Sequence, residues 1–271
     1  MPQIILYLSH NYQRKMDRSL KNILEEYFKG GTDSFLPHLS INNVVFGYDH
    51  PRLKVIVHRV PGQDFWLLPG GYIKYEENLG DAVYRNLKLS GIENVFLRQI
   101  RTFGDAFRIA GYTAKEEAQN SKDKDILHWV SRRFVTIVYY GLVKYHQTRL
   151  VNGAIFSETK WMDVNNLDNL AGDHASIIVE TRKMLVTELQ NHPVASSLLP
   201  ESFTFNELRG LYEAILNRSI DRGTFRRKIL KQGIVEQIDK RKDVIGRPSH
   251  IFQFNQEIYL KSLADETKFG F

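Results

Sequence analysis

Cationic side chains gather near the C-terminal end of the chain, and they are of the types that bind nucleic acid. Residues 222–232 fit an amphipathic helix with Asp221 as its N-cap. Phe225, Ile229 and Leu230 are predicted to form its buried side, while the rest carries five cations and no acid. Arginine and lysine contact DNA phosphates, and arginine also pairs with guanine edges. The helix is therefore predicted to bind DNA; the alternative is a solvated basic surface.

A capped helix and a basic loop extend this pattern. Thr204 and Glu207 have the spacing of a capping box at the start of an amphipathic helix. Residues 234–238 and 249–254 indicate two antiparallel strands on either side of a basic loop, 239–248, which would be a wing. Together these elements predict a winged helix-turn-helix that binds double-stranded operator DNA. The predicted DNA-binding residues are Arg218, Arg222, Thr224, Arg226, Arg227, Lys228, Lys231, Lys240, Arg241 and Arg247.

A second motif begins at Leu68-Pro69-Gly70-Gly71, before a helix predicted over residues 78–90. Residues 40–172 resemble a Nudix domain. The Nudix box reads Gly, five residues, Glu, seven residues, Arg-Glu, aliphatic, any residue, Glu-Glu, any residue, Gly, aliphatic. The matching positions are Gly71, Glu77, Arg85, Leu87 and the pair Gly91-Ile92. The resemblance implies that Glu77 and Arg85 brace the loop against the helix.

The departures from this box concern its metal ligands. Nudix hydrolysis of a pyrophosphate uses glutamates on the box helix to hold a divalent cation, which prefers carboxylate oxygens. Here Asn86, Leu89 and Ser90 stand at those positions, and one residue is missing before the glycine. Glu76, Glu77 and Asp81 come one or more turns too early for that role. We therefore predict no enzyme activity, no catalytic residue, no metal and no cofactor.

A degenerate Nudix domain followed by a winged helix resembles the Nudix-related transcriptional regulators of bacteria, which control NAD metabolism or sugar utilisation. Residues 199–204, 212–216, 225–228 and 246–248 carry the C-terminal part of the resemblance. It implies a homodimer whose Nudix domain senses a small effector: a sugar, a sugar phosphate or an ADP-ribose-like metabolite.

In that fold the effector pocket lies between the box and the neighbouring strands. Arginines there could pair with phosphates, and aromatic rings could stack on a base or sugar. The alternative is that the aromatic residues belong to the core and that Arg85 is structural. His174 is expected to be a capping or surface residue rather than a ligand. The candidate effector-binding residues are Arg59, Phe65, Trp66, Arg85, Arg101 and Phe103.

The composition sets limits on these interpretations. The chain has 271 residues, enough for two domains, a net charge of +6, and no cysteine, which excludes disulfides and zinc–thiolate sites. No apolar run approaches the roughly 20 residues needed to cross a bilayer. We therefore expect a cytoplasmic protein with no membrane partner, and a basic charge that favours a polyanion.

The elements that must position these residues are predicted from local patterns. An amphipathic helix is expected over residues 11–29 and an exposed insertion over 110–131. A hairpin is expected through Asp49-His50-Pro51, with further strands near 95–100 and 134–143, and a helix from Asp173-His174 to about 190. The apolar residues of this last helix are Ile177, Ile178, Val179, Met184, Leu185 and Leu189.

The predicted fold class is α/β (α+β): a Nudix-like mixed sheet between helices, followed by a winged helix-turn-helix. The predicted boundaries are an N-terminal helical extension (1–38), a Nudix-like sensing domain (39–175), a connecting helix and linker (176–199) and a winged-helix domain (200–271). Three functions compete: an effector-responsive transcriptional regulator, an active Nudix-type nucleoside-diphosphate pyrophosphohydrolase, and a DNA-architectural protein whose Nudix domain only dimerises.

Overall fold

A computed structural model describes residues 34–59, 65–93, 95–106, 108, 132–152, 156–191, 194–241, 249–255 and 257–258. The helix predicted over 11–29 and the insertion predicted over 110–131 lie outside these residues. The elements run in the order β1 (Phe35–Asp49), β2 (Arg52–Arg59), β3 (Gly70–Lys74), α4 (Leu79–Lys88), β4 (Phe96–Phe103), β5 (Val135–Leu142), β6 (Glu158–Asp163), α7 (His174–Asn191), β7 (Phe203–Thr204), α8 (Phe205–Leu216), α9 (Arg222–Gln232), β8 (Val235–Arg241) and β9 (Ser249–Phe254). Short 3-10 helices occupy Tyr145–Gln147 and Val194–Ser197.

The first sheet is mixed. Its strands lie in the order β4-β5-β1-β2-β6, and β3 pairs with β1 beside this path. β1 runs parallel to β5, while the other pairs are antiparallel. The predicted hairpin is confirmed, because Asp49 of β1 pairs with Arg52 of β2.

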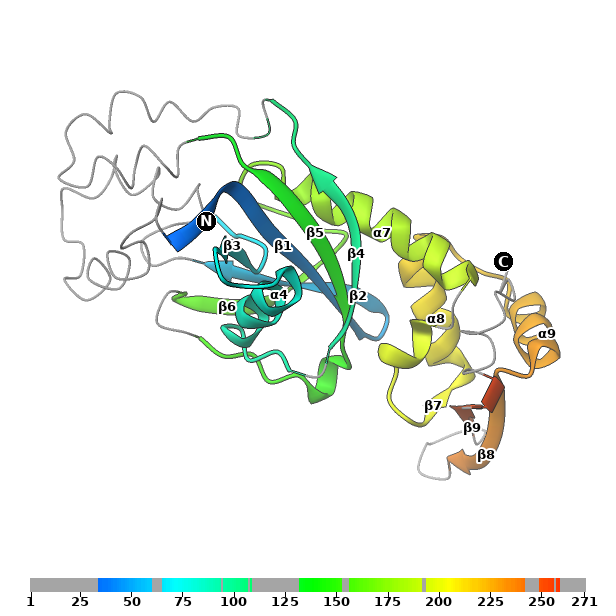
Figure 1. The fold of residues 1–271 in the computed structure, drawn as a ribbon. Helices are drawn as coiled ribbons and strands as arrows, with labels where there is room; N and C mark the ends of the chain where they lie inside the picture. Colours follow the sequence, from blue (N-terminus) through cyan, green and yellow to red (C-terminus); the bar gives the residue numbers. More distant parts are fainter. Residues whose placement is uncertain are drawn as a thin grey trace.

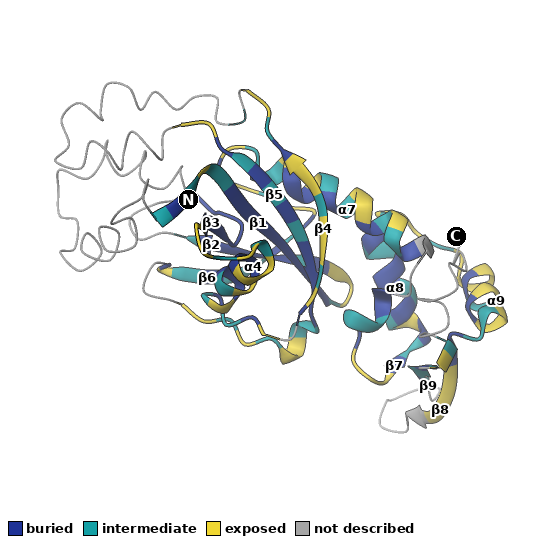
Figure 2. Ribbon diagram, viewed as in Figure 1, coloured by how far each residue is buried: buried dark blue, intermediate teal, exposed yellow. Residues whose placement is uncertain are grey.

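One helix packs on each face of this sheet (Figure 1). Alternate residues of β1 point to opposite faces, so Val45 packs with α4 and Val44 packs with α7. The sheet is buried along most of β1 and β2 (Figure 2). Of the apolar residues named in α7, Val179 and Met184 are exposed.

The second sheet has the order β7-β9-β8 and belongs to the C-terminal module with α8 and α9. The hydrophobic core continues from the first sheet into this module, since Phe46 on β1 and Phe225 on α9 belong to the same buried cluster. At the junction, the tip of the β1–β2 hairpin meets α8. A Cβ added at Gly210 would lie 2.6 Å from the Tyr48 hydroxyl and 2.8 Å from His50 Cε1. Glycine therefore allows this close approach.

None of the helices among the described residues is long and apolar enough to cross a membrane.

Candidate functional site

The turn between α8 and α9 is held by local hydrogen bonds. Thr204 and Glu207 form the predicted capping box, and Asn217 ends α8 in the left-handed conformation. The Asp221 carboxylate accepts from the Thr224 backbone N–H at 2.8 Å, which confirms the predicted N-cap of α9. These caps satisfy backbone groups at the helix ends and so fix where α9 begins relative to α8.

The buried side of α9 anchors it to the module. Phe225 and Ile229 are fully buried, and the Phe225 ring packs edge-on against Tyr212 and Phe205. The prediction for Leu230 is wrong, because 43% of this residue is exposed. Its position lies more than 100° around the helix from Phe225, so the core does not reach it.

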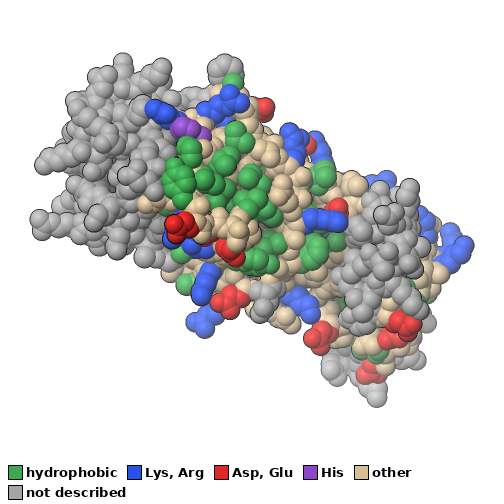
Figure 3. All heavy atoms as spheres, in the orientation of Figure 1, with side chains coloured by type: hydrophobic (Ala, Val, Ile, Leu, Met, Phe, Trp, Pro, Cys, Tyr) green, Lys and Arg blue, Asp and Glu red, His purple; other side chains and the backbone are tan. Residues whose placement is uncertain are grey.

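The residues predicted to bind DNA differ in their exposure. The exposed residues lie around α9 and the turn before it: Arg218, Arg222, Thr224, Arg227, Lys228 and Lys231. Arg226 is only partly exposed, and its guanidinium lies 5.0 Å from the centre of the Phe205 ring and 5.7 Å from that of Phe252. Lys240 and Arg241 end β8, and Arg247 lies outside the described residues. Cationic side chains project from the end of the molecule that carries α9 (Figure 3).

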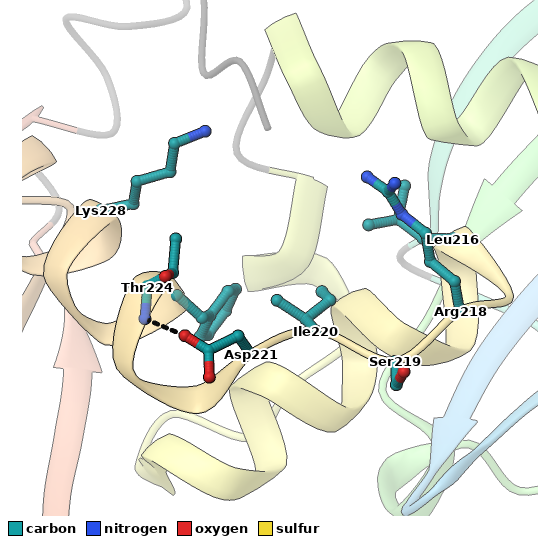
Figure 4. Close-up of a pocket in the computed structure, with 8 residues that line it drawn as sticks. Leu216, Arg218, Ser219, Ile220, Asp221, Thr224 and Lys228 are labelled. Atoms are coloured by element: carbon teal, nitrogen blue, oxygen red, sulfur yellow. Dashed lines mark hydrogen bonds between the residues drawn. The ribbon is translucent and has the colours of Figure 1, made fainter.

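A pocket of about 240 Å³ opens beside the α8–α9 turn (Figure 4). Arg218 and Lys228 lie at opposite ends of it, with the Asp221–Thr224 hydrogen bond between them. The remaining lining residues are Leu216, Ser219, Ile220 and Phe225. Arg218 lies in the turn before α9 and Lys228 lies within α9, so an anion in this pocket would meet both cations as well as the Asp221 carboxylate.

In the Nudix-like domain, Arg85 has the bracing role that the resemblance implies. Its guanidinium donates to the Glu77 carboxylate at 2.6 and 2.8 Å and to the Tyr72 carbonyl at 2.7 Å. The bond from Arg85 lowers the pKa of Glu77 below its ordinary value. Because these bonds occupy both groups in joining the loop to α4, Arg85 acts as a structural residue in this conformation.

The polar residues Asn86 and Ser90 of the box are buried. Asn86 donates from Nδ2 to the Ala82 carbonyl at 2.7 Å. The Ser90 hydroxyl and His58 Nε2 are 2.9 Å apart, and His58 Nδ1 lies 3.0 Å from the Thr159 hydroxyl. Burial lowers the pKa of His58 to about 3, so its ring is neutral at pH 7. Within the described parts of the chain, no group of three or more His, Cys, Asp or Glu side chains is arranged to hold a metal ion.

The candidate effector residues lie in different parts of the sheet. Arg59 pairs with Glu158 and lies 4.8 Å from the Trp66 ring centre. Arg101 lies 4.6 Å from the centre of the Phe103 ring. Arg59 is on β2 and Arg101 is on β4, three strands away in the sheet order. The aromatic candidates are largely buried, with Phe65 and Trp66 at 7% exposure and Phe103 at 8%.

Lys160 is a cation of this region that sequence reasoning missed. Its Nζ lies 3.7 Å from the Trp66 ring centre, so Arg59 and Lys160 both contact one indole. No motif singled it out, because its place beside Trp66 depends on the pairing of β6 with β2, in which Lys160 lies opposite Val57.

His174 differs from its prediction as a capping or surface residue. It is buried, and its Nδ1 accepts from the Leu68 backbone N–H at 3.0 Å. Its neighbour Asp173 accepts two hydrogen bonds from Arg108, at 2.9 and 3.0 Å. Arg108 also donates to the Phe134 carbonyl at 3.0 Å. The start of α7 is thus tied to the sheet by residues that no local periodicity singles out.

Comparisons with known proteins agree with this architecture. Residues 195–254 match the family model of the NrtR DNA-binding winged helix domain. The chain is 26% identical to the ADPR responsive transcriptional repressor NtrR of Acinetobacter baylyi, over 87% of this chain and 88% of the relative.

Two solved structures of Shewanella oneidensis NrtR are also similar. The first is 24% identical with a TM-score of 0.61 and covers 82% of this chain and 96% of its own. The second, complexed with a 27mer DNA, is 25% identical with a TM-score of 0.59 and covers 82% of this chain and 95% of its own. The chain is thus a Nudix-like domain joined to a winged helix of the NrtR type, which is the organisation of the Nudix-related transcriptional regulators.

Proposed function

We propose that this protein is an effector-responsive bacterial transcriptional regulator that acts in the cytoplasm and binds operator DNA through its winged helix. The observation that carries this proposal is the basic helix α9, held in place by buried Phe225 and Ile229, within a domain of the NrtR DNA-binding type. The DNA complex of the Shewanella relative supports the same partner. The residues proposed to contact DNA are Arg218, Arg222, Thr224, Arg226, Arg227, Lys228 and Lys231, with Lys240, Arg241 and Arg247 from the wing.

The effector proposed first is ADP-ribose, because the Acinetobacter relative responds to ADPR. Sugars and sugar phosphates remain in the screen as the other members of the predicted class. Arg59 and Lys160 beside Trp66 supply cations for a diphosphate, although Glu158 balances one of them in this conformation. A bound diphosphate would therefore compete with Glu158 for Arg59.

The Nudix-like domain is proposed to sense this ligand without hydrolysing it. Asn86, Leu89 and Ser90 stand where the box glutamates would hold a metal, and Ser90 is bonded to a neutral histidine. Neutral amide and hydroxyl oxygens bind a hard cation more weakly than carboxylates do. The same proposal includes the domain limits. The sensing domain spans 39–175 and the DNA-binding domain spans 200–271; residues 176–199 join them, and the extension 1–38 precedes them.

A homodimer is proposed as the active form, since a twofold protein suits a pseudo-palindromic operator. Hydrophobic side chains show on the sheet face beside α4 (Figure 3). Leu39, Leu97, Ile137 and Tyr139 pack on that side and are only partly buried. This face is a surface through which two copies could associate.

The test combines ligand binding with DNA binding. A duplex is selected from a randomised pool by the full-length protein and its affinity is measured by fluorescence anisotropy, with and without ADP-ribose. A regulator should select one sequence, and ADP-ribose should change the affinity for it. A ligand at 100 times its Kd should also stabilise the folded protein by about 2.7 kcal/mol. Selection of a sequence without any response to these ligands would favour the architectural alternative, and metal-dependent turnover of ADP-ribose would favour the hydrolase.

A further inference from the structure

One side of α9 combines three residues that the core does not use. Gly223, Arg227 and Leu230 are spaced four and three residues apart, so they lie on one side of the helix. Phe225 and Ile229 occupy the opposite side and are fully buried. We call Gly223, Arg227 and Leu230 the outer stripe of α9.

Packing among the described residues does not require a glycine at position 223. A Cβ added there would meet Asp221 Oδ1 at 3.6 Å, which is ordinary contact. Glycine costs up to about 1 kcal/mol relative to alanine in a helix. A glycine in such an open position is useful where another molecule must approach the helix backbone closely.

Leu230 is the apolar member of the stripe. It is 43% exposed, although its helix otherwise shows mainly polar and cationic side chains to solvent. Arg227 lies one turn before it, and Lys231 follows it; both are exposed. Such a surface suits a partner that is anionic around an apolar group.

DNA offers this combination in the major groove. Its phosphates are anionic, and the C5-methyl of thymine is the apolar group on the groove floor. The groove is about 12 Å wide, close to the diameter of an α-helix with its side chains, so a helix without a side chain at Gly223 can sit deeper in it.

We propose that the outer stripe of α9 faces the base edges and that Leu230 contacts the 5-methyl group of a thymine in each half-site. This contact rests on the DNA-binding function proposed above and adds a sequence preference to it. Arg227, in the middle of the stripe, is then the residue that meets a base edge beside that thymine.

The test replaces thymines by uracils, which lack only the methyl group. Variants of the duplex selected by the full-length protein are synthesised. In each variant, deoxyuridine replaces thymidine at one position of each half-site, the two positions being related by symmetry. Wild-type affinity should fall about fourfold per lost methyl contact at one position, the factor that corresponds to about 0.8 kcal/mol. Leu230→Ala should bind the thymine duplex more weakly than the wild type does. Its affinity should not fall further when deoxyuridine replaces the contacted thymine.

Val179→Ala serves as the matched control, because Val179 is exposed to a similar extent, 44%, on α7. It should keep the full deoxyuridine effect. If every deoxyuridine effect persists in Leu230→Ala while the protein still selects its sequence, the thymine contact is refuted and the DNA-binding function stands. Dissociation of a dimer by Leu230→Ala, measured by light scattering, with unchanged deoxyuridine effects would assign Leu230 to a protein interface. Failure of the wild-type protein to select any sequence contradicts both proposals.

Discussion

The guanidinium of Arg182, on α7, donates from Nε to the backbone carbonyl of Ile215, in the last turn of α8, at 3.1 Å. The same side chain donates to the Ala214 carbonyl and, at 2.8 Å, to Oδ1 of Asn165 beyond β6. Carbonyls at a helix C-terminus lack partners within the helix, and a cation there is favourable. Arg182 therefore joins the Nudix-like domain to the helix that precedes α9.

Replacing Arg182 should destabilise this joint. Arg182→Ala leaves the Ala214 and Ile215 carbonyls without their donor, and we expect a loss of about 1.5–3 kcal/mol in the free energy of unfolding measured in urea. The control is Lys183→Ala, because Lys183 is exposed and pairs with Glu180 one turn away on the same helix. Its expected effect is below about 0.5 kcal/mol. Equal stability of the two variants would show that Arg182 does not hold the joint.

The contact between Gly210 and Tyr48 should be sensitive to a single methyl group. Gly210→Ala places a Cβ 2.6 Å from the Tyr48 hydroxyl, so the hairpin must shift, at an expected cost of about 1–3 kcal/mol. Tyr48→Phe removes that hydroxyl, and the double variant should recover part of the loss in a double-mutant cycle. Strict additivity of the two substitutions would contradict this contact.

Gly223→Ala is the opposite case, since the added Cβ meets nothing closer than 3.6 Å. It should raise stability by up to about 1 kcal/mol, because alanine favours helix. Affinity for the selected duplex should fall at the same time if the outer stripe faces DNA. Thermal unfolding and anisotropy measure the two effects separately, and tighter DNA binding would argue against a close backbone approach.

Arg226 and Arg227 should respond differently to alanine. Arg226 lies over two core rings, so its loss should lower stability by about 0.5–2 kcal/mol as well as affect DNA binding. Arg227 is exposed, and Arg227→Ala should keep stability while it weakens DNA binding. Urea unfolding of both variants, together with their DNA affinities, checks this division. If Arg227→Ala were less stable than Arg226→Ala, the roles assigned to the two arginines would be wrong.

Stability should fall as the pH drops below about 6.5. Burial lowers the pKa of His58 to about 3 and the pKa of His174 well below its ordinary value. The unfolded state therefore binds more protons than the folded state below pH 6.5, and the contribution present above that pH is lost on the way toward pH 3. Each neutral buried histidine adds a slope of up to about 1.4 kcal/mol per pH unit in this window. His58→Gln should flatten the dependence measured in urea between pH 7 and 5; an unchanged slope would show that His58 titrates normally.

Incubation with ADP-ribose and Mg²⁺ should give no hydrolysis, because the box helix has Asn86 and Ser90 at metal-binding positions. Product release is followed by chromatography. Turnover that survives purification and disappears with EDTA would contradict this expectation.

The sequence by itself determined the features that depend on residues near one another in the chain. The Thr204–Glu207 capping box and the Asp221 cap follow from spacings of three residues within one helix turn, which no distant contact changes. The Glu77–Arg85 brace was implied by the resemblance to the Nudix box, whose spacing these residues match, and the structure shows it. Runs of β-branched and aromatic residues predicted the hairpin through 49–51 and the strands near 95–100 and 134–143, whereas β3 and β6 were not predicted.

Only the tertiary structure decided which of several similar side chains are exposed and which pack against other residues. Arg226 and Arg227 are identical in type and adjacent, but Phe252 of β9 packs next to one of them alone. His174 is buried because β1 and the Leu68 backbone, more than a hundred residues earlier, come to lie against the start of α7. Leu230 is exposed because the core packs against the side of α9 that carries Phe225 and Ile229 and does not reach the side that carries Leu230. Such outcomes depend on which segments, distant in the sequence, pack against a residue. A local sequence pattern does not contain this information.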